Sequence, residues 1–153
     1  MANTIILKGR GVRKEAVAAS TITPGDLLTI DSTGKLARHA TAKGDAARLF
    51  AVENDLVGLT ISDDYAANSY VQSEYLRTGD EVLANVAANA AAIVIGDLLE
   101  SDGAGGLRKR TAASQLTSGN YAYTPAGSVI AQALQAVDNS AGASRTRIKV
   151  VLL

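Results

Sequence analysis

The chain has 153 residues with no cysteine and no tryptophan, and its 15 basic and 15 acidic residues give a formal net charge of zero. The balanced charge argues against a general nucleic-acid-binding protein, and the lack of cysteine excludes disulfide bonds and thiolate metal sites. Neither a signal peptide nor a run of about 18 apolar residues is found, so we expect one soluble domain with no membrane partner.

The first 14 residues differ in composition from the rest of the chain. They hold a single apolar run among glycines and basic residues, a mixture that cannot build a core. We predict an extended N-terminal arm over residues 1–14, flexible in the free protein, followed by a single β domain over residues 15–153; a plain disordered end is the alternative. The candidate residues for contact with a partner or a neighbouring subunit are Ile5, Ile6, Leu7, Lys8, Arg10, Arg13 and Lys14.

Short apolar runs between turn residues fill the rest of the chain. Strands are predicted over residues 12–20 and 27–31, within 50–61 (two strands), and over 128–138 and 144–153. Residues 70–87 favour a hairpin with its tip at 78–80, with a helix over 70–76 as the alternative, and residues 62–68 favour one capped helical turn. Residues 112–128 are predicted to form a long exposed loop. Turn signals at intervals of about 8 to 12 residues predict an all-β barrel or sandwich.

One stretch is written nearly twice. "PGDLLTIDSTGKL" (residues 24–36) returns as "IGDLLESDGAGGL" (residues 95–107). Each copy predicts a β-hairpin with an Asp- and Gly-bearing turn. Shared turn chemistry is the simpler explanation, but four identical consecutive residues favour an internal duplication, with halves of about 20–90 and 91–153. Each half is small, so we expect the two to pack into one barrel-like core.

No constellation of an enzyme is found in the sequence. His39 is the only histidine and has no carboxylate at strand or helix spacing, so we interpret it as a surface residue. The Asp102 loop lacks the later acceptors of a calcium loop, and Asp63 and Asp64 are better explained as turn caps than as an acid–base pair with Glu74. The basic clusters at 108–110 and 145–149 are interpreted as solvated strand faces. We therefore expect no catalytic residue, no cofactor and no metal.

A resemblance enters with the second half of the chain. The segments "GDLLESDGAGGLRK", "SVIAQALQAVDNS" and "RTRIKVVLL" resemble the small decoration, or cement, proteins of tailed-bacteriophage capsids. The resemblance implies a compact β fold, usually trimeric, bound outside an icosahedral head at three-fold or quasi-three-fold positions, where it clamps adjacent major capsid subunits. It implies no catalytic residues to carry over.

These expectations define partners and location. The partners would be the major capsid protein and two further copies in a homotrimer, an oligomer also being favoured by the alanine-rich core, with no direct nucleic-acid contact. The location would be the capsid exterior of a virion assembled in the bacterial cytoplasm. Two alternatives stay open: another virion component, such as a head fibre base or tail protein, and, with weaker support because Trp is absent, a glycan-binding β-barrel.

Overall fold

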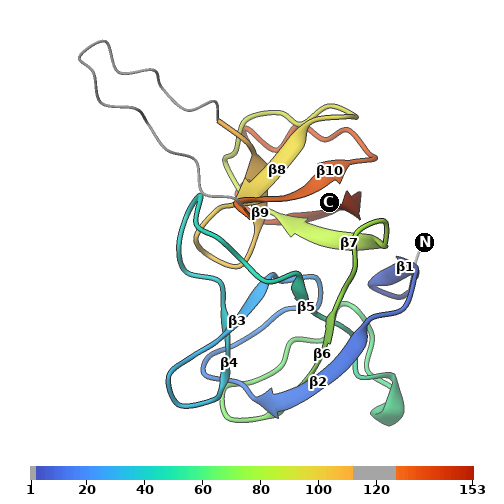
Figure 1. Cartoon of the computed structure of the whole chain (residues 1–153), viewed down its shortest axis with the longest axis vertical. Coiled ribbons are helices and arrows are strands. Elements are labelled where there is room, and N and C mark those ends of the chain that lie inside the picture. The colour runs from blue at the N-terminus through green and yellow to red at the C-terminus, as the bar shows by residue number, and fades with distance from the viewer. Residues whose placement is uncertain (1–2, 112–126) are drawn as a thin grey trace.

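The computed structural model of the chain describes residues 3–111 and 127–153 (Figure 1). The all-β fold class is confirmed, because the described residues contain no α-helix and a single 3-10 turn, η1 (Asp55–Val57). The strands, in chain order, are β1 (Ile6–Lys8), β2 (Val12–Val17), β3 (Leu28–Ile30), β4 (Leu36–Arg38), β5 (Leu49–Ala51), β6 (Tyr70–Tyr75), β7 (Glu81–Val86), β8 (Leu98–Ser101), β9 (Leu107–Lys109), β10 (Val129–Ala133) and β11 (Thr146–Leu152).

The part of the chain from β7 to β11, which begins before the boundary near residue 90 expected from the repeat, forms a closed five-strand barrel in the order β7–β11–β10–β8–β9. The barrel closes because β9 returns to β7, where Val86 pairs with Leu107 in parallel. Strand residues alternate between the two faces of a sheet, so every second residue of β7 and β11 points inward. The inward residues are apolar and fully or almost fully buried: Val82, Ala84, Val86, Ile148, Val150 and Leu152.

The part from β2 to β6 repeats this arrangement with strands of equal or shorter length. β2, β6 and β5 form one sheet and β3 and β4 form a hairpin. Single bridges join the two, Leu27 with Phe50 at one side and Ala18 with Leu36 in parallel at the other. The interior of this first barrel is filled by Ala18, Ile22, Leu28, Leu36, Leu49, Ala51, Tyr65 and Val71.

The two barrels are equivalent pairing by pairing. The parallel closure Ala18–Leu36 corresponds to Val86–Leu107. The isolated bridge Ile22–Tyr65 corresponds in the same way to Ile93–Val137. In terms of these pairings, one unit runs from β2 to β6 and the other from β7 to β11.

The expectation of one shared barrel core is corrected by the structure. Each half closes on itself through its parallel bridge and therefore buries its own apolar face. The halves lie one above the other along the long axis of the molecule (Figure 1). Phe50 and Val52 of the first half point outward and join the larger cluster of the second half, which couples the two barrels.

A Gly-Asp turn occurs three times and explains why this pair recurs in the sequence. Gly25, Gly79 and Gly96 have φ of 93°, 95° and 92°, a region that favours glycine. The Asp that follows each glycine accepts a hydrogen bond from the N–H three residues before it, over 3.0, 2.8 and 2.8 Å. Each glycine N–H then donates to a neighbouring strand, to the carbonyls of Ala51, Leu152 and Ala133.

Several local predictions are wrong. Residues 57–61 form no strand and residues 65–68 form no helical turn. Residues 70–75 do form a strand, as the main prediction had it, and not the alternative helix. The predicted hairpin over 70–87 has its turn but not its pairing, since β6 pairs with β2 and β5 whereas β7 pairs with β1, β9 and β11. The turn at Gly79 docks on Leu152 and passes the chain from one barrel to the other. The predicted loop over 112–128 falls largely outside the described residues.

Candidate interaction surfaces

The predicted N-terminal arm is largely built into the fold. Ile5 is fully buried, its N–H donates to Glu53 Oε2 over 2.9 Å, and its carbonyl accepts from the Leu83 N–H over 2.8 Å. Ile6 pairs with Val82 of β7. The apolar run at residues 5–7 pairs with the edge of β7. The structure therefore does not show the flexible arm that was expected for these residues. Ile5 is closed to any partner, whereas Ile6 and Leu7 stay half-buried.

The four basic candidates of this segment lie in different settings. Lys8 is exposed and pairs with Glu81 over 2.8 Å, and Arg13 lies 3.8 Å from Glu74. Lys14 is half-buried within β2, where its carbonyl accepts from the Ser73 hydroxyl. Arg10 is exposed, and no carboxylate among the described residues forms an ion pair with it. Arg10 therefore offers the most available charge of the set.

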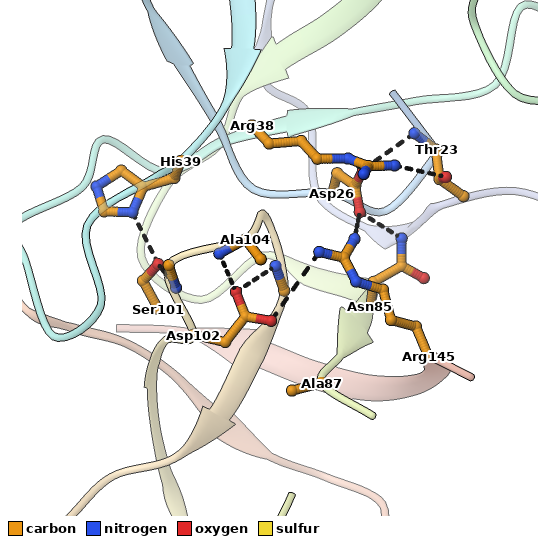
Figure 2. A network of polar contacts seen from close by, with 12 residues as sticks. Thr23, Asp26, Arg38, His39, Asn85, Ala87, Ser101, Asp102, Ala104 and Arg145 are labelled. Atoms are coloured by element: carbon orange, nitrogen blue, oxygen red, sulfur yellow. Dashed lines mark hydrogen bonds and ion pairs between the residues drawn. The ribbon is translucent and has the colours of Figure 1, made fainter. Parts of the chain in front are cut away.

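The junction of the barrels is organised around Asp26 (Figure 2). This carboxylate is fully buried and accepts from Arg38 Nε over 2.7 Å and from Arg145 Nη1 over 2.7 Å. Asn85 Nδ2 and the Thr23 N–H complete its shell at 2.8 and 3.0 Å. Four donors from both barrels satisfy the charge, as burial of a carboxylate requires. These hydrogen bonds occupy both carboxylate oxygens, and Asp26 thereby joins the two barrels.

His39 is buried, not on the surface as its sequence context indicated. Its Nδ1 lies 2.7 Å from the Ser101 hydroxyl and its Nε2 lies 3.0 Å from the Asp45 carbonyl oxygen. Ser101 belongs to β8, so this pair is a second polar link between the halves (Figure 2). Both ring nitrogens are occupied, and the pair has a structural role.

The acidic turn residues cap backbone groups. Asp102 Oδ1 accepts from the N–H groups of Ala104 and Gly106 over 2.6 and 2.8 Å, as Asp31 does for Thr33 and Lys35 in the first hairpin. Asp63 accepts from the Thr60 N–H over 2.7 Å, and this hydrogen bond lowers the pKa of Asp63. Among the described residues no group of three or more His, Cys, Asp or Glu side chains is placed to hold a metal ion.

A groove of about 750 Å³ runs between the barrels beside this junction. One wall consists of Arg145 together with Arg147 and Lys149 of β11. Leu7 and Ile61 contribute an apolar side. Arg147 donates to the carbonyls of Pro24 and Ile61, and burial lowers its pKa. Arg145 and Arg147 are therefore half-buried links between the barrels, which corrects their interpretation as a solvated face, while Lys149 is exposed.

Exposed apolar side chains gather at separate places. Leu56 and Val57 on η1 are 72% and 67% exposed. Val94 and Ile95 in the turn before β8 are 55% and 67% exposed, and Tyr70 at the start of β6 is 70% exposed. The sequence shows these residues as ordinary strand-formers, because only the barrel geometry decides which of them face outward.

Comparison with known proteins gives a fold relationship. No protein-family model and no curated protein matches the chain. No helix long and apolar enough to cross a membrane occurs in residues 3–111 and 127–153. Among solved structures, the head fibre gp8.5 N base of bacteriophage phi29 is similar, with a TM-score of 0.53 and 15% sequence identity. The similarity covers 94% of this chain and 95% of that one, so the two share their fold over almost their entire lengths.

Proposed function

We propose that the chain is a structural virion protein of a bacteriophage and serves as the base that anchors a head fibre to the outside of the capsid. The observation that carries this proposal is the fold similarity to a head fibre base over nearly the full length of both chains. It favours the head fibre base over the capsid clamp that the sequence resemblance first indicated. In this role the chain performs no catalysis, in keeping with the saturated settings of Asp26 and His39.

The partner in this proposal is the major capsid protein, contacted on the capsid exterior. Of the seven candidate contact residues, Ile5 is excluded by burial, and the proposal rests on the others: Ile6, Leu7, Lys8, Arg10, Arg13 and Lys14. Charges at the rim of such a contact act mainly on the association rate and its salt dependence. A homotrimer on the shell is part of the same proposal, as is assembly in the host cytoplasm.

Binding to capsid shells tests the function directly. The purified chain is mixed with shells that lack it, and the bound copies are counted by co-sedimentation and electron microscopy. We expect saturable decoration at a fixed ratio to the shell protein. Shells that stay bare at every protein concentration, or virions from which antibodies against the chain detect no copy, would contradict the proposal.

The contact residues need a gentler variant than truncation, because removing residues 2–11 would also remove the buried Ile5. Lys8, Arg10 and Arg13 are replaced together by Ala, with Lys35→Ala at the far hairpin turn as the control. The triple variant should bind shells more weakly, and the difference should shrink as salt approaches 1 M, where the screening length is about 3 Å. Equal affinity of the wild type and the triple variant for shells would show that Lys8, Arg10 and Arg13 do not contribute to the contact.

A further inference from the structure

One turn of the first barrel is seated on the second barrel. The Gly25 carbonyl accepts from the Asn85 N–H over 3.0 Å, and the Pro24 carbonyl accepts from Arg147 Nε over 3.0 Å. A Cβ placed on Gly25 would lie 2.8 Å from the Leu83 carbonyl oxygen, so the contact leaves no space. We call Leu83, Asn85 and Arg147 the receiving face of the second barrel.

The equivalent turn of the second barrel, residues 94–97, is uncovered in the described part of the chain. It has the same Asp cap and the same glycine conformation as residues 23–26. A Cβ placed on Gly96 would nevertheless meet no atom within 4 Å. The two leading positions, Thr23 and Pro24 in the first barrel, are Val94 and Ile95 here, and both are more than half exposed. The second barrel thus presents an apolar copy of a turn that is seated in the first.

The matching receiving face of the first barrel is also open. Val17 pairs with Tyr70 across β2 and β6, as Asn85 pairs with Arg147 across β7 and β11. Residues 17 and 70 are therefore the counterparts of 85 and 147. Tyr70 is 70% exposed and Val17 is half-buried. At these two positions the face is apolar where its counterpart is polar, whereas Glu15, which corresponds to Leu83 by the same pairings, is exposed and charged.

The backbone of β2 can make the hydrogen bond that corresponds to the one between the Asn85 N–H and the Gly25 carbonyl. β2 is the outer strand of its three-stranded sheet, and on the side away from β6 the single bridge Ala18–Leu36 joins it to β4. The Ala18 N–H donates to Ser69 beside β6, and the Ala19 N–H donates to Leu36 on the other side. By alternation the Val17 N–H points away from β6, in the direction in which its counterpart Asn85 donates to Gly25. An edge of this kind pairs readily with another chain.

We propose that copies of this chain associate head to tail, with the turn at 94–97 of one copy seated on the Val17 and Tyr70 face of the next. Inside the chain Thr23 and Pro24 lie against Asn85 and Arg147, and between copies Val94 and Ile95 would lie against Val17 and Tyr70. A second copy is the occupant because the turn at 23–26 already fits the edge of β7 within the molecule. A second copy brings the equivalent turn, 94–97, to the equivalent edge, that of β2.

The positions of the two surfaces agree with this arrangement. β8, which comes directly after the exposed turn, and β2 lie at opposite ends of the molecule (Figure 1). Each copy therefore gives one contact and receives another. Such a heterologous contact closes into a ring if the rotation between copies permits, and otherwise extends as an open chain.

Engineered cysteines test the contact cleanly, because the chain has none of its own. We expect the variant carrying both Ile95→Cys and Val17→Cys to form covalent multimers with a short thiol-specific cross-linker, and a mixture of the two single variants to stop at dimers. A control variant with Leu56→Cys and Val17→Cys, which uses an apolar residue of similar exposure elsewhere, should give only background. Multimers no more abundant than in that control would overturn the proposal.

Sedimentation velocity gives a second test without cross-linking. Ile95→Glu and Tyr70→Glu should each abolish self-association, while Leu56→Glu should not. Mixing Ile95→Glu with Tyr70→Glu should restore dimers only, because one intact turn and one intact face then remain. A wild-type chain that is monomeric up to sub-millimolar concentration would overturn the proposal. Both tests use the protein alone, so their outcome is separate from that of the shell-binding experiment.

Discussion

Asp26 and Asp97 accept the same backbone hydrogen bond in equivalent turns, but Asp26 is buried between two arginines whereas Asp97 lies near the surface beside one lysine. Arg38 and Lys109 are the equivalent cations, since each comes two residues after an equivalent leucine, Leu36 or Leu107. The repeat thus supplies a matched pair of carboxylates that differ in their surroundings.

We predict that Asp26→Asn lowers the free energy of unfolding by about 3–5 kcal/mol, the usual cost of removing one partner from a buried ion pair. Asp97→Asn, which breaks an equivalent pair in a more exposed setting, should cost much less. Chemical denaturation of both variants measures the difference. Equal losses would mean that the barrel junction adds nothing to the Asp26 interaction.

The glycines of the same turns give a second matched pair. Gly96→Ala should cost about 1–2 kcal/mol, because its φ of 92° is unfavourable for a residue with a Cβ. Gly25→Ala carries the same strain and also presses its Cβ against the Leu83 carbonyl, which should add about 1–3 kcal/mol. Thermal and chemical denaturation at low protein concentration separate the two variants, and identical values would contradict the seated turn.

The burial of Ile5 predicts a role in stability for the first residues of the chain. Ile5→Ala should lower the free energy of unfolding by about 2–5 kcal/mol, the range for a buried large-to-small substitution. Val12→Ala, at a 59% exposed position of the neighbouring strand, should change it by less than about 0.5 kcal/mol. An Ile5→Ala variant as stable as wild type would contradict this prediction and favour the flexible arm expected from the sequence.

Acid should weaken the fold through its turn carboxylates. Hydrogen bonds from Thr33 and Ser140 hold the pKa values of Asp31 and Asp138 below their ordinary value of 3.8. Because the folded pKa is lower than the unfolded one, the stabilisation is present above pH 3.8 and is lost as the pH falls through the folded value. Denaturation between pH 6 and pH 2 should show this loss. The double variant Asp31→Asn and Asp138→Asn should show a shallower one.

Alkali should act through Tyr65. Burial raises the pKa of Tyr65 from 10.0 to about 12, and its hydroxyl donates to the Val52 carbonyl over 2.7 Å. The unfolded chain therefore loses this proton first, and stability should fall as the pH rises from 10 to about 12. Tyr65→Phe should cost about 1 kcal/mol at neutral pH through the lost hydrogen bond. The variant should lose less of its stability than wild type in the alkaline range, and an unchanged slope would contradict this assignment.

Local chemistry predicts the turns and most strands of this fold, because a Gly with positive φ and an Asp cap act within four residues. Partners are harder to predict. The turn residues between the strands at 70–75 and 81–86 predict a hairpin. In the structure the two strands do not pair with each other, and the turn at Gly79 connects one barrel to the other. His39 follows the charged Arg38 in the sequence, yet it is buried, with its Nδ1 2.7 Å from the hydroxyl of Ser101, far along the chain.

The candidate surfaces show the same limit. The charges of residues 8–14 are visible in the sequence, but only the pairing of Ile6 with Val82 shows that the apolar run beside them is committed to the core. Val94 and Ile95 are exposed because nothing in the described part of the chain covers their turn, whereas the equivalent turn at Gly25 is seated on the second barrel. The sequence of either turn alone does not show this difference.

The pairing of β1 with β7 also constrains the order of folding during synthesis. A ribosome releases the chain from its N-terminus, and β2 to β6 can complete the first barrel before Val82 has emerged. Ile5 and Ile6 must wait throughout that time without a partner. β1 can therefore dock only once β7 has been made, when all strands of the barrel next to it in sequence are already available.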